Sequence, residues 1–179
     1  MTSTDQTEFD PAEGERLRVH AGEYLEGARD GRGLRIGIVC ARFNGAITTR
    51  LLESALNALA EGDVERSDIS IAWVPGAFEV PLAALAYADA ERPCDAVITL
   101  GAVIRGDTGH YEVVAGECAR GVQDVQLSTR VPVVFGVLTV NTVEQALQRS
   151  LPDQSNKGRE AALTALEMVD LLRQGSLAS

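Results

Sequence analysis

Four short apolar runs alternate with helix-like stretches along most of the chain. The runs are LRIGIVC at 34–40, ISIAWV at 69–74, DAVITLGAVI at 95–104 and PVVFGVLTV at 132–140. Each is apolar throughout instead of alternating with polar residues, which is typical of strands buried on both faces of a parallel sheet. The pattern therefore predicts an α/β fold in which helices cover both faces of a four-stranded parallel sheet.

Between and after these runs, apolar residues recur at the spacing of amphipathic helices. In residues 44–62 they fall on one helical face, and Gly62 marks its end. Pro81 must lie in the first turn of the next helix, because proline is poorly tolerated further inside. Thr142 and Gln145 have the spacing of a capping box. We predict helices over 44–62, 78–91, 110–128, from Thr142 onward, and over 158–173.

Residues 1–33 differ from the rest of the chain, because they are polar, charged and rich in glycine. We expect them to form a flexible N-terminal extension, with a helical turn around Glu13–Leu25. A chain of 179 residues most often forms one domain, so we assign residues 34–179 to a single α/β domain.

Composition narrows the class of protein. The chain is 45% apolar and 23% charged, as a globular protein is. Its net charge of −10 argues against nonspecific nucleic-acid binding, although a few arginines can still hold an anion locally. No apolar run approaches the ~18 residues of a membrane span, and the acidic N-terminus lacks the apolar region of a signal peptide. We expect a soluble, cytoplasmic protein.

The chain offers few metal ligands. It has two histidines, His20 and His110, far apart in sequence, and three cysteines without a CxxC pair. We expect free thiols in a reducing compartment and no metal cluster.

Polar and aromatic residues follow each apolar run. The segments are ARFN at 41–44, VPGAFE at 74–79, IRGDTGHYE at 104–112 and NTVEQALQRS at 141–150. Because ligands of open parallel sheets bind beyond the carboxyl ends of the strands, we expect these segments to meet at one edge.

The segment at 104–112 carries the strongest candidate chemistry. His110 can exchange protons near neutral pH, or it can be an ordinary residue of a first helical turn. GDTGH offers backbone N–H groups at a helix start, which suit a phosphate or carboxylate, or it can be a plain glycine-rich turn.

The other segments leave similar alternatives open. Phe43 and Phe78 can stack on a planar ring or belong to the core, and Glu79 can bind a ligand or simply begin a helix. Arg105 and Arg149 can bind a ligand or be solvated surface residues. Together the segments indicate a small, planar, phosphorylated substrate and a proton carrier.

These stretches, read in order, resemble the lumazine synthase family. The resemblance covers residues 34–172 and rests on RFN at 42–44, VPGAFEVP at 74–81, LGAVIRGDTGHYE at 100–112, FGVLTVNTVEQALQR at 135–149 and NKGREAALTALEM at 156–168. It implies a flavodoxin-like three-layer α/β/α sandwich with a four-stranded parallel sheet. It also implies a transferase of riboflavin biosynthesis that condenses 5-amino-6-(D-ribitylamino)uracil with 3,4-dihydroxy-2-butanone 4-phosphate. The products are 6,7-dimethyl-8-ribityllumazine, phosphate and water, and the reaction uses no cofactor or metal.

The resemblance also implies a role for each matching residue. His110 matches the proton-transfer residue, and Arg149 matches a phosphate-binding residue donated by a neighbouring subunit. Asp107 and Thr108 match the phosphate seat, and Lys157 is a further candidate there. The residues that match the pyrimidine and ribityl site are Phe43, Ala77, Phe78, Glu79, Ala102, Val103, Ile104 and, from the neighbouring subunit, Phe135.

The sequence departs from the family pattern at two acidic positions, Asp107 in the phosphate seat and Asp153 where a lysine is usual. These departures favour one alternative, a catalytically weakened paralogue that carries flavin or lumazine or serves as a shell protein. The resemblance implies that copies of the chain assemble into a homopentamer. The length of the 149–157 segment favours an icosahedral shell of such pentamers. Riboflavin synthase is a further candidate partner.

Overall fold

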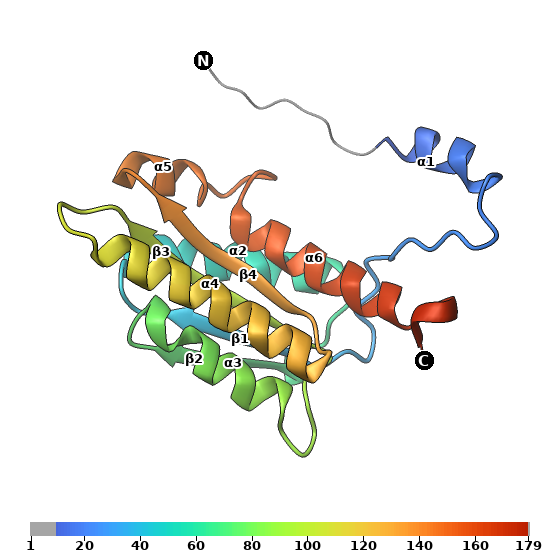
Figure 1. Ribbon diagram of the computed structural model, residues 1–179, viewed down its shortest axis with the longest axis horizontal. Coiled ribbons are helices and arrows are strands. Elements are labelled where there is room, and N and C mark those ends of the chain that lie inside the picture. The colour runs from blue at the N-terminus through green and yellow to red at the C-terminus, as the bar shows by residue number, and fades with distance from the viewer. Residues whose placement is uncertain (1–9, 179) are drawn as a thin grey trace.

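The computed structural model describes residues 10–178 and contains one four-stranded, all-parallel sheet (Figure 1). Its strands are β1 (Ile36–Ala41), β2 (Ile69–Val74), β3 (Ala96–Ile104) and β4 (Val133–Val140), in the order β2-β1-β3-β4. Every neighbouring pair is parallel, and helices cover both faces. The predicted α/β class and the four strands are confirmed.

Two pairs of helices enclose the sheet (Figure 1). On one face, α2 (Gly45–Glu61) and α6 (Lys157–Leu172) share a core with β1 and β3 that contains Leu51, Ile98 and Leu166. On the other face, α3 (Val80–Ala88) and α4 (His110–Thr129) enclose a second core with Val39 and Val122. Three short 3-10 turns complete the main domain and its C-terminus: Arg66–Asp68, Ala77–Glu79 and Gly175–Ala178.

The expectation that all four strands are buried on both faces is wrong for the two edge strands, β2 and β4. Strands β1 and β3 lie in the middle of the sheet and are almost wholly buried. In contrast, Ile71 and Trp73 of β2 and Phe135 of β4 are exposed. An apolar run therefore did not distinguish a central strand from an edge strand.

Local signals explain where several helices begin. Pro81 lies in the first turn of α3, as predicted, but this helix starts two residues later than expected because Ala77–Glu79 form a separate 3-10 turn. The hydroxyl of Thr142 accepts a hydrogen bond from the Gln145 backbone N–H (3.2 Å) and caps the short helix α5 (Val143–Gln148). The Gln145 side chain accepts from the N–H of Asn141 (2.8 Å), the residue before the cap, and not from the Thr142 N–H, so only the Thr142 half of the predicted capping box is formed.

The N-terminal residues described by the structure contain a helix, α1 (Pro11–Arg18), which lies away from the sheet (Figure 1). It starts before the helical turn expected around Glu13–Leu25. The chain then returns to the domain, where the Ala28 N–H donates to Asp170 (2.8 Å) and Arg29 pairs with Glu167. A side chain at Gly27 would overlap the Glu167 backbone, so this close approach to α6 requires glycine.

Candidate active site

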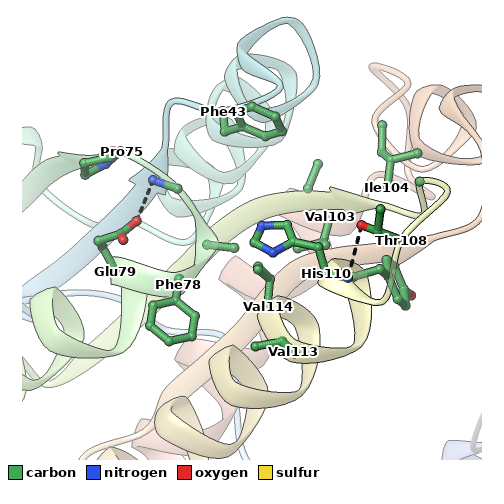
Figure 2. Close-up of a pocket in the computed structure, with 15 residues that line it drawn as sticks. Phe43, Pro75, Phe78, Glu79, Val103, Ile104, Thr108, His110, Val113 and Val114 are labelled. Carbon is green, nitrogen blue, oxygen red and sulfur yellow. Dashed lines mark hydrogen bonds between the residues drawn. The ribbon is translucent and has the colours of Figure 1, made fainter.

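A cavity of about 700 Å³ opens beyond the carboxyl ends of β1, β2 and β3, beside the start of α4 (Figure 2). It brings together nine residues that the sequence singles out: Phe43, Ala77, Phe78, Glu79, Ala102, Val103, Ile104, Thr108 and His110. Three of the four segments expected to meet therefore line one cavity at the carboxyl ends of the strands, whereas no residue of the fourth, 141–150, lines it.

The different lengths of the strands create this cavity. Strand β1 pairs with β3 only as far as Leu100, whereas β4 pairs with β3 as far as Ile104. The last residues of β3 therefore turn one backbone edge toward the cavity instead of toward β1. Asn44 occupies part of this edge, because its side-chain amide donates to the Ala102 carbonyl (2.8 Å).

Two aromatic rings border the cavity while remaining largely exposed. Phe43 is 71% exposed and Phe78 is 55% exposed, so neither ring is a core residue. The turn that carries Phe43 is fixed by hydrogen bonds from its own N–H to the Pro75 carbonyl (3.1 Å) and from Asn44 to β3. Exposed apolar rings at the mouth of a cavity suit a planar ligand.

Glu79 contributes a carboxylate on the same side of the cavity as Phe78. One of its oxygens accepts a hydrogen bond from the Gly76 backbone N–H (3.0 Å; Figure 2). This bond closes the turn between β2 and α3 and fixes the direction of the carboxylate. Glu79 thus stabilises a local turn and also lines the cavity.

His110 is the first residue of α4, and its imidazole lies among the lining residues close to Val114 and Val103 (Figure 2). Its side chain is exposed, and its backbone N–H donates to the Thr108 hydroxyl (3.4 Å). The N-terminal cap of α4 is Gly109, which provides no side-chain acceptor. An imidazole beside an uncapped helix start can transfer protons next to a bound anion.

Arg105 does not line the cavity. It forms an ion pair with Glu112, donates from Nε to the Asn141 side chain (3.1 Å), and stacks 4.1 Å from the centre of the Tyr111 ring. The hydrogen bond from Arg105 lowers the pKa of the Glu112 carboxyl below its usual value. Arg105 is thus a bound residue of the protein surface and not a freely solvated one.

A second hollow, of about 420 Å³, lies along the edge strand β4 and helix α6. Phe135, Arg149 and Lys157 line it, so the structure places these three predicted residues together but away from the first cavity. Arg149 donates to the Gln145 carbonyl (3.1 Å), and Lys157 pairs with Glu160. Among the described residues, the two hollows share no lining residue.

The two acidic departures line neither hollow. Asp107 is exposed, while its neighbours Gly106 and Thr108 face the first cavity. Asp153 accepts hydrogen bonds from the backbone and the hydroxyl of Ser155 (2.8 and 2.6 Å), which lower the pKa of its carboxyl. Neither acidic side chain therefore lines a hollow in which it would repel a bound phosphate.

Sequence reasoning missed several lining residues. Val113 and Val114 follow His110 by three and four positions, so helical spacing alone would have placed them on the same face. Tyr111 and Gly106 are immediate neighbours of predicted residues and carried no separate signal. The turn residues Pro75 and Gly76 also line the cavity.

Other features of the described chain bear on its class. Within residues 10–178, no group of three or more histidine, cysteine or acidic side chains is arranged to hold a metal ion. Every helix in this range is too short or too polar to cross a bilayer. The three cysteines are free thiols, and burial raises the pKa of Cys40 and of Cys118 to about 11.

Residues 33–173 match the family model described as 6,7-dimethyl-8-ribityllumazine synthase. The match spans most of the chain and includes every residue that lines either hollow.

Proposed function

Because the chain belongs to the 6,7-dimethyl-8-ribityllumazine synthase family, we propose that the cavity beside His110 binds the pyrimidine substrate and forms half of the active site. The family reaction is that of a transferase in riboflavin biosynthesis. The amine of 5-amino-6-(D-ribitylamino)uracil adds to the ketone of 3,4-dihydroxy-2-butanone 4-phosphate, and loss of water gives an imine. Phosphate is then eliminated, and ring closure releases a second water.

The pyrimidine is held by stacking and by backbone hydrogen bonds. Phe43 offers an exposed ring for the uracil, and the edge of Ala102–Ile104 that β1 does not pair offers N–H and carbonyl groups to the ring. Ala77, Phe78 and Glu79 border the ribityl chain. Such fixed contacts hold the amine near the ketone carbon, which is where positioning accelerates a bimolecular reaction.

His110 carries the protons of the addition and elimination steps. It is the only histidine that lines the described cavity, and its exposed imidazole lies among the residues assigned to the pyrimidine. A histidine at this place can donate to the departing phosphate oxygen or accept from the attacking amine.

The phosphate lies at the start of α4, beside Thr108 and the backbone of Asp107. A helix N-terminus favours an anion, but a dianion also requires cations, and the described lining of this cavity contains no lysine or arginine. Arg149 and Lys157 supply them from the second hollow of a neighbouring copy, and Phe135 covers the pyrimidine from the same side. This separation of the cavity from its cations is the observation that carries the proposal.

The assembly is a homopentamer in the cytoplasm. The two surfaces that meet are different, since one carries the first cavity with α3 and the other carries the β4 edge. Contacts between unlike surfaces generate closed rings when the rotation permits. The 149–157 segment favours further assembly of pentamers into an icosahedral shell, with riboflavin synthase as a candidate partner. Sedimentation velocity distinguishes a pentamer from a shell.

Replacing His110 by alanine tests the central role. We expect turnover above the spontaneous background to fall by about 10²-fold, because a positioned general acid–base contributes at least this much, while pyrimidine binding is retained. His20→Ala, at the other histidine, is the matched control and keeps full activity. The assay is formation of lumazine absorbance from both substrates. Unchanged turnover in His110→Ala would remove His110 from this role, and wild-type protein that binds riboflavin without any turnover would indicate a carrier.

A further inference from the structure

Arg105 holds together three elements around the phosphate-binding loop. Its backbone N–H extends the β3–β4 ladder by donating to the Val140 carbonyl (2.9 Å). Its guanidinium reaches the first turn of α4 through Glu112 and reaches the residue after β4 through Asn141. The ring of Tyr111 packs against the guanidinium plane. One side chain therefore connects the end of β3, the end of β4 and the start of α4.

The loop that Arg105 anchors has little other support. A side chain at Gly106 or Gly109 would meet no atom within 4 Å, so both glycines of the loop face open space. Thr108 and Asp107 are both exposed. The contacts of Arg105 at one end and the start of α4 at the other consequently determine where this loop lies.

A continuous series of hydrogen bonds leads from Arg105 to Arg149. The Asn141 side chain accepts from Arg105, and the Asn141 backbone N–H donates to the Gln145 side chain (2.8 Å). The Gln145 carbonyl in turn accepts from the Arg149 guanidinium (3.1 Å). The loop anchored by Arg105 and the Arg149 guanidinium are thus linked through Asn141 and Gln145.

We propose that Arg105 is a positioning residue that sets the Thr108–His110 loop and helix α5, and through α5 the direction of Arg149. This inference rests on the proposed function, because it takes the loop and Arg149 as the two halves of phosphate binding. The planar fork of arginine is required, since one guanidinium must bind Glu112 and Asn141 in different directions while stacking on Tyr111. Lysine has a single charged point and cannot make all three contacts.

The test compares three single variants, Arg105→Gln, Arg105→Lys and Arg149→Lys. It also includes the double variant that combines Arg105→Gln with Arg149→Lys. Arg120→Gln is the control, because Arg120 is an exposed arginine of α4 whose ion pairs, with Glu117 and Asp124, stay within that helix. The measurements are kcat and KM for each substrate, the pyrimidine Kd and the thermal midpoint of every variant.

We expect Arg105→Gln to raise KM for the phosphorylated ketone on the order of tenfold, since displaced positioning groups carry losses of this size. We expect Arg105→Lys not to restore this KM, and the pyrimidine Kd to change by less than about twofold. Arg120→Gln should behave as wild type, because its ion pairs connect residues of α4 only and hold no other element. The double variant loses less than the product of the two single losses, because both act on one phosphate contact.

Three results would overturn the inference: an unchanged KM in Arg105→Gln, full rescue by lysine, or equal losses for both substrates together with a lowered thermal midpoint. If Arg105→Gln behaves as expected but Arg149→Lys leaves KM unchanged, the role of Arg149 in the proposed function is wrong, and so is the link through α5. The two failures are therefore distinguishable.

Discussion

The two hollows of the protomer differ in the chemistry that they offer. The first, beside α4, is bordered by exposed aromatic rings and contains His110, but its described lining has no lysine or arginine. The second, along β4 and α6, contains Arg149 and Lys157 together with Phe135, which is 38% exposed. One suits a planar ring and proton transfer, and the other suits an anion.

This difference indicates that neither hollow is a complete site for a reaction between an aromatic amine and a phosphate ester. Edge strands and exposed apolar side chains are the usual places for contact between subunits. The second hollow lies on an edge strand. The turn at Ala77–Glu79, which lines the first hollow, leads directly into α3, where Leu82 is 75% exposed. Assembly is therefore part of the proposed catalytic mechanism.

Separating the protomers should have the largest effect. We expect Leu82→Glu to prevent assembly and to lower turnover by more than about 10²-fold, because the cations no longer reach the phosphate. The exposed side chain contributes little to the protomer's own core, so the fold should persist. Sedimentation and circular dichroism measure assembly and fold, and Val19→Glu, at an exposed position outside the sheet domain, is the control. An active, monomeric Leu82→Glu protein would contradict the division into two halves.

Removing one cation sharpens the comparison. We expect Arg149→Ala to raise KM for the phosphorylated ketone by about thirtyfold, which corresponds to a charge-assisted hydrogen bond of about 2 kcal/mol. The pyrimidine Kd should be unaffected, since Arg149 lies in the other hollow. Steady-state kinetics with each substrate varied in turn measure both values, with Arg50→Ala on the exposed face of α2 as control. A defect confined to pyrimidine binding would contradict the role of Arg149 in binding the phosphate.

Removing the aromatic ring of Phe43 tests the first hollow in the same way. We expect Phe43→Ala to weaken pyrimidine binding by about fivefold, because stacking on one exposed ring contributes about 1 kcal/mol. KM for the phosphorylated ketone should stay near the wild-type value. Fluorescence titration with the pyrimidine measures the first quantity. Loss of ketone affinity without loss of pyrimidine affinity would show that the ring of Phe43 serves a different substrate.

Much of the fold followed from the sequence because each strand is a compact apolar run and two of the helices have clear signals at their start. Thr142 caps a helix by accepting from the Gln145 N–H, as its position predicts, and Pro81 lies in a first helical turn. The edge position of β2 could not be predicted, because strand order depends on tertiary packing and Ile71 and Trp73 look like core residues by type.

The site was less predictable than the fold. The four loops were expected to converge because parallel strands end at one edge, and nine predicted residues from the first three do line one cavity, while Arg149 of the fourth lines the second hollow. The contacts of Arg105 with Glu112 and Asn141 had no sequence signal, since Asn141 is 36 residues away along the chain. The division of the cations from the ring site is equally a property of the folded surface. The resemblance to a family implied it, and residue patterns alone did not.

The most direct test of a site formed by two copies is complementation between His110→Ala and Arg149→Ala. The two variants are refolded together in equal amounts, and turnover is measured at a phosphorylated-ketone concentration well below the KM of Arg149→Ala. In a ring of mixed protomers, about a quarter of the sites combine an intact cavity with an intact arginine from the neighbour. The account predicts recovery to about this fraction of wild-type turnover. Activity no higher than the sum of the two separate variants would contradict it.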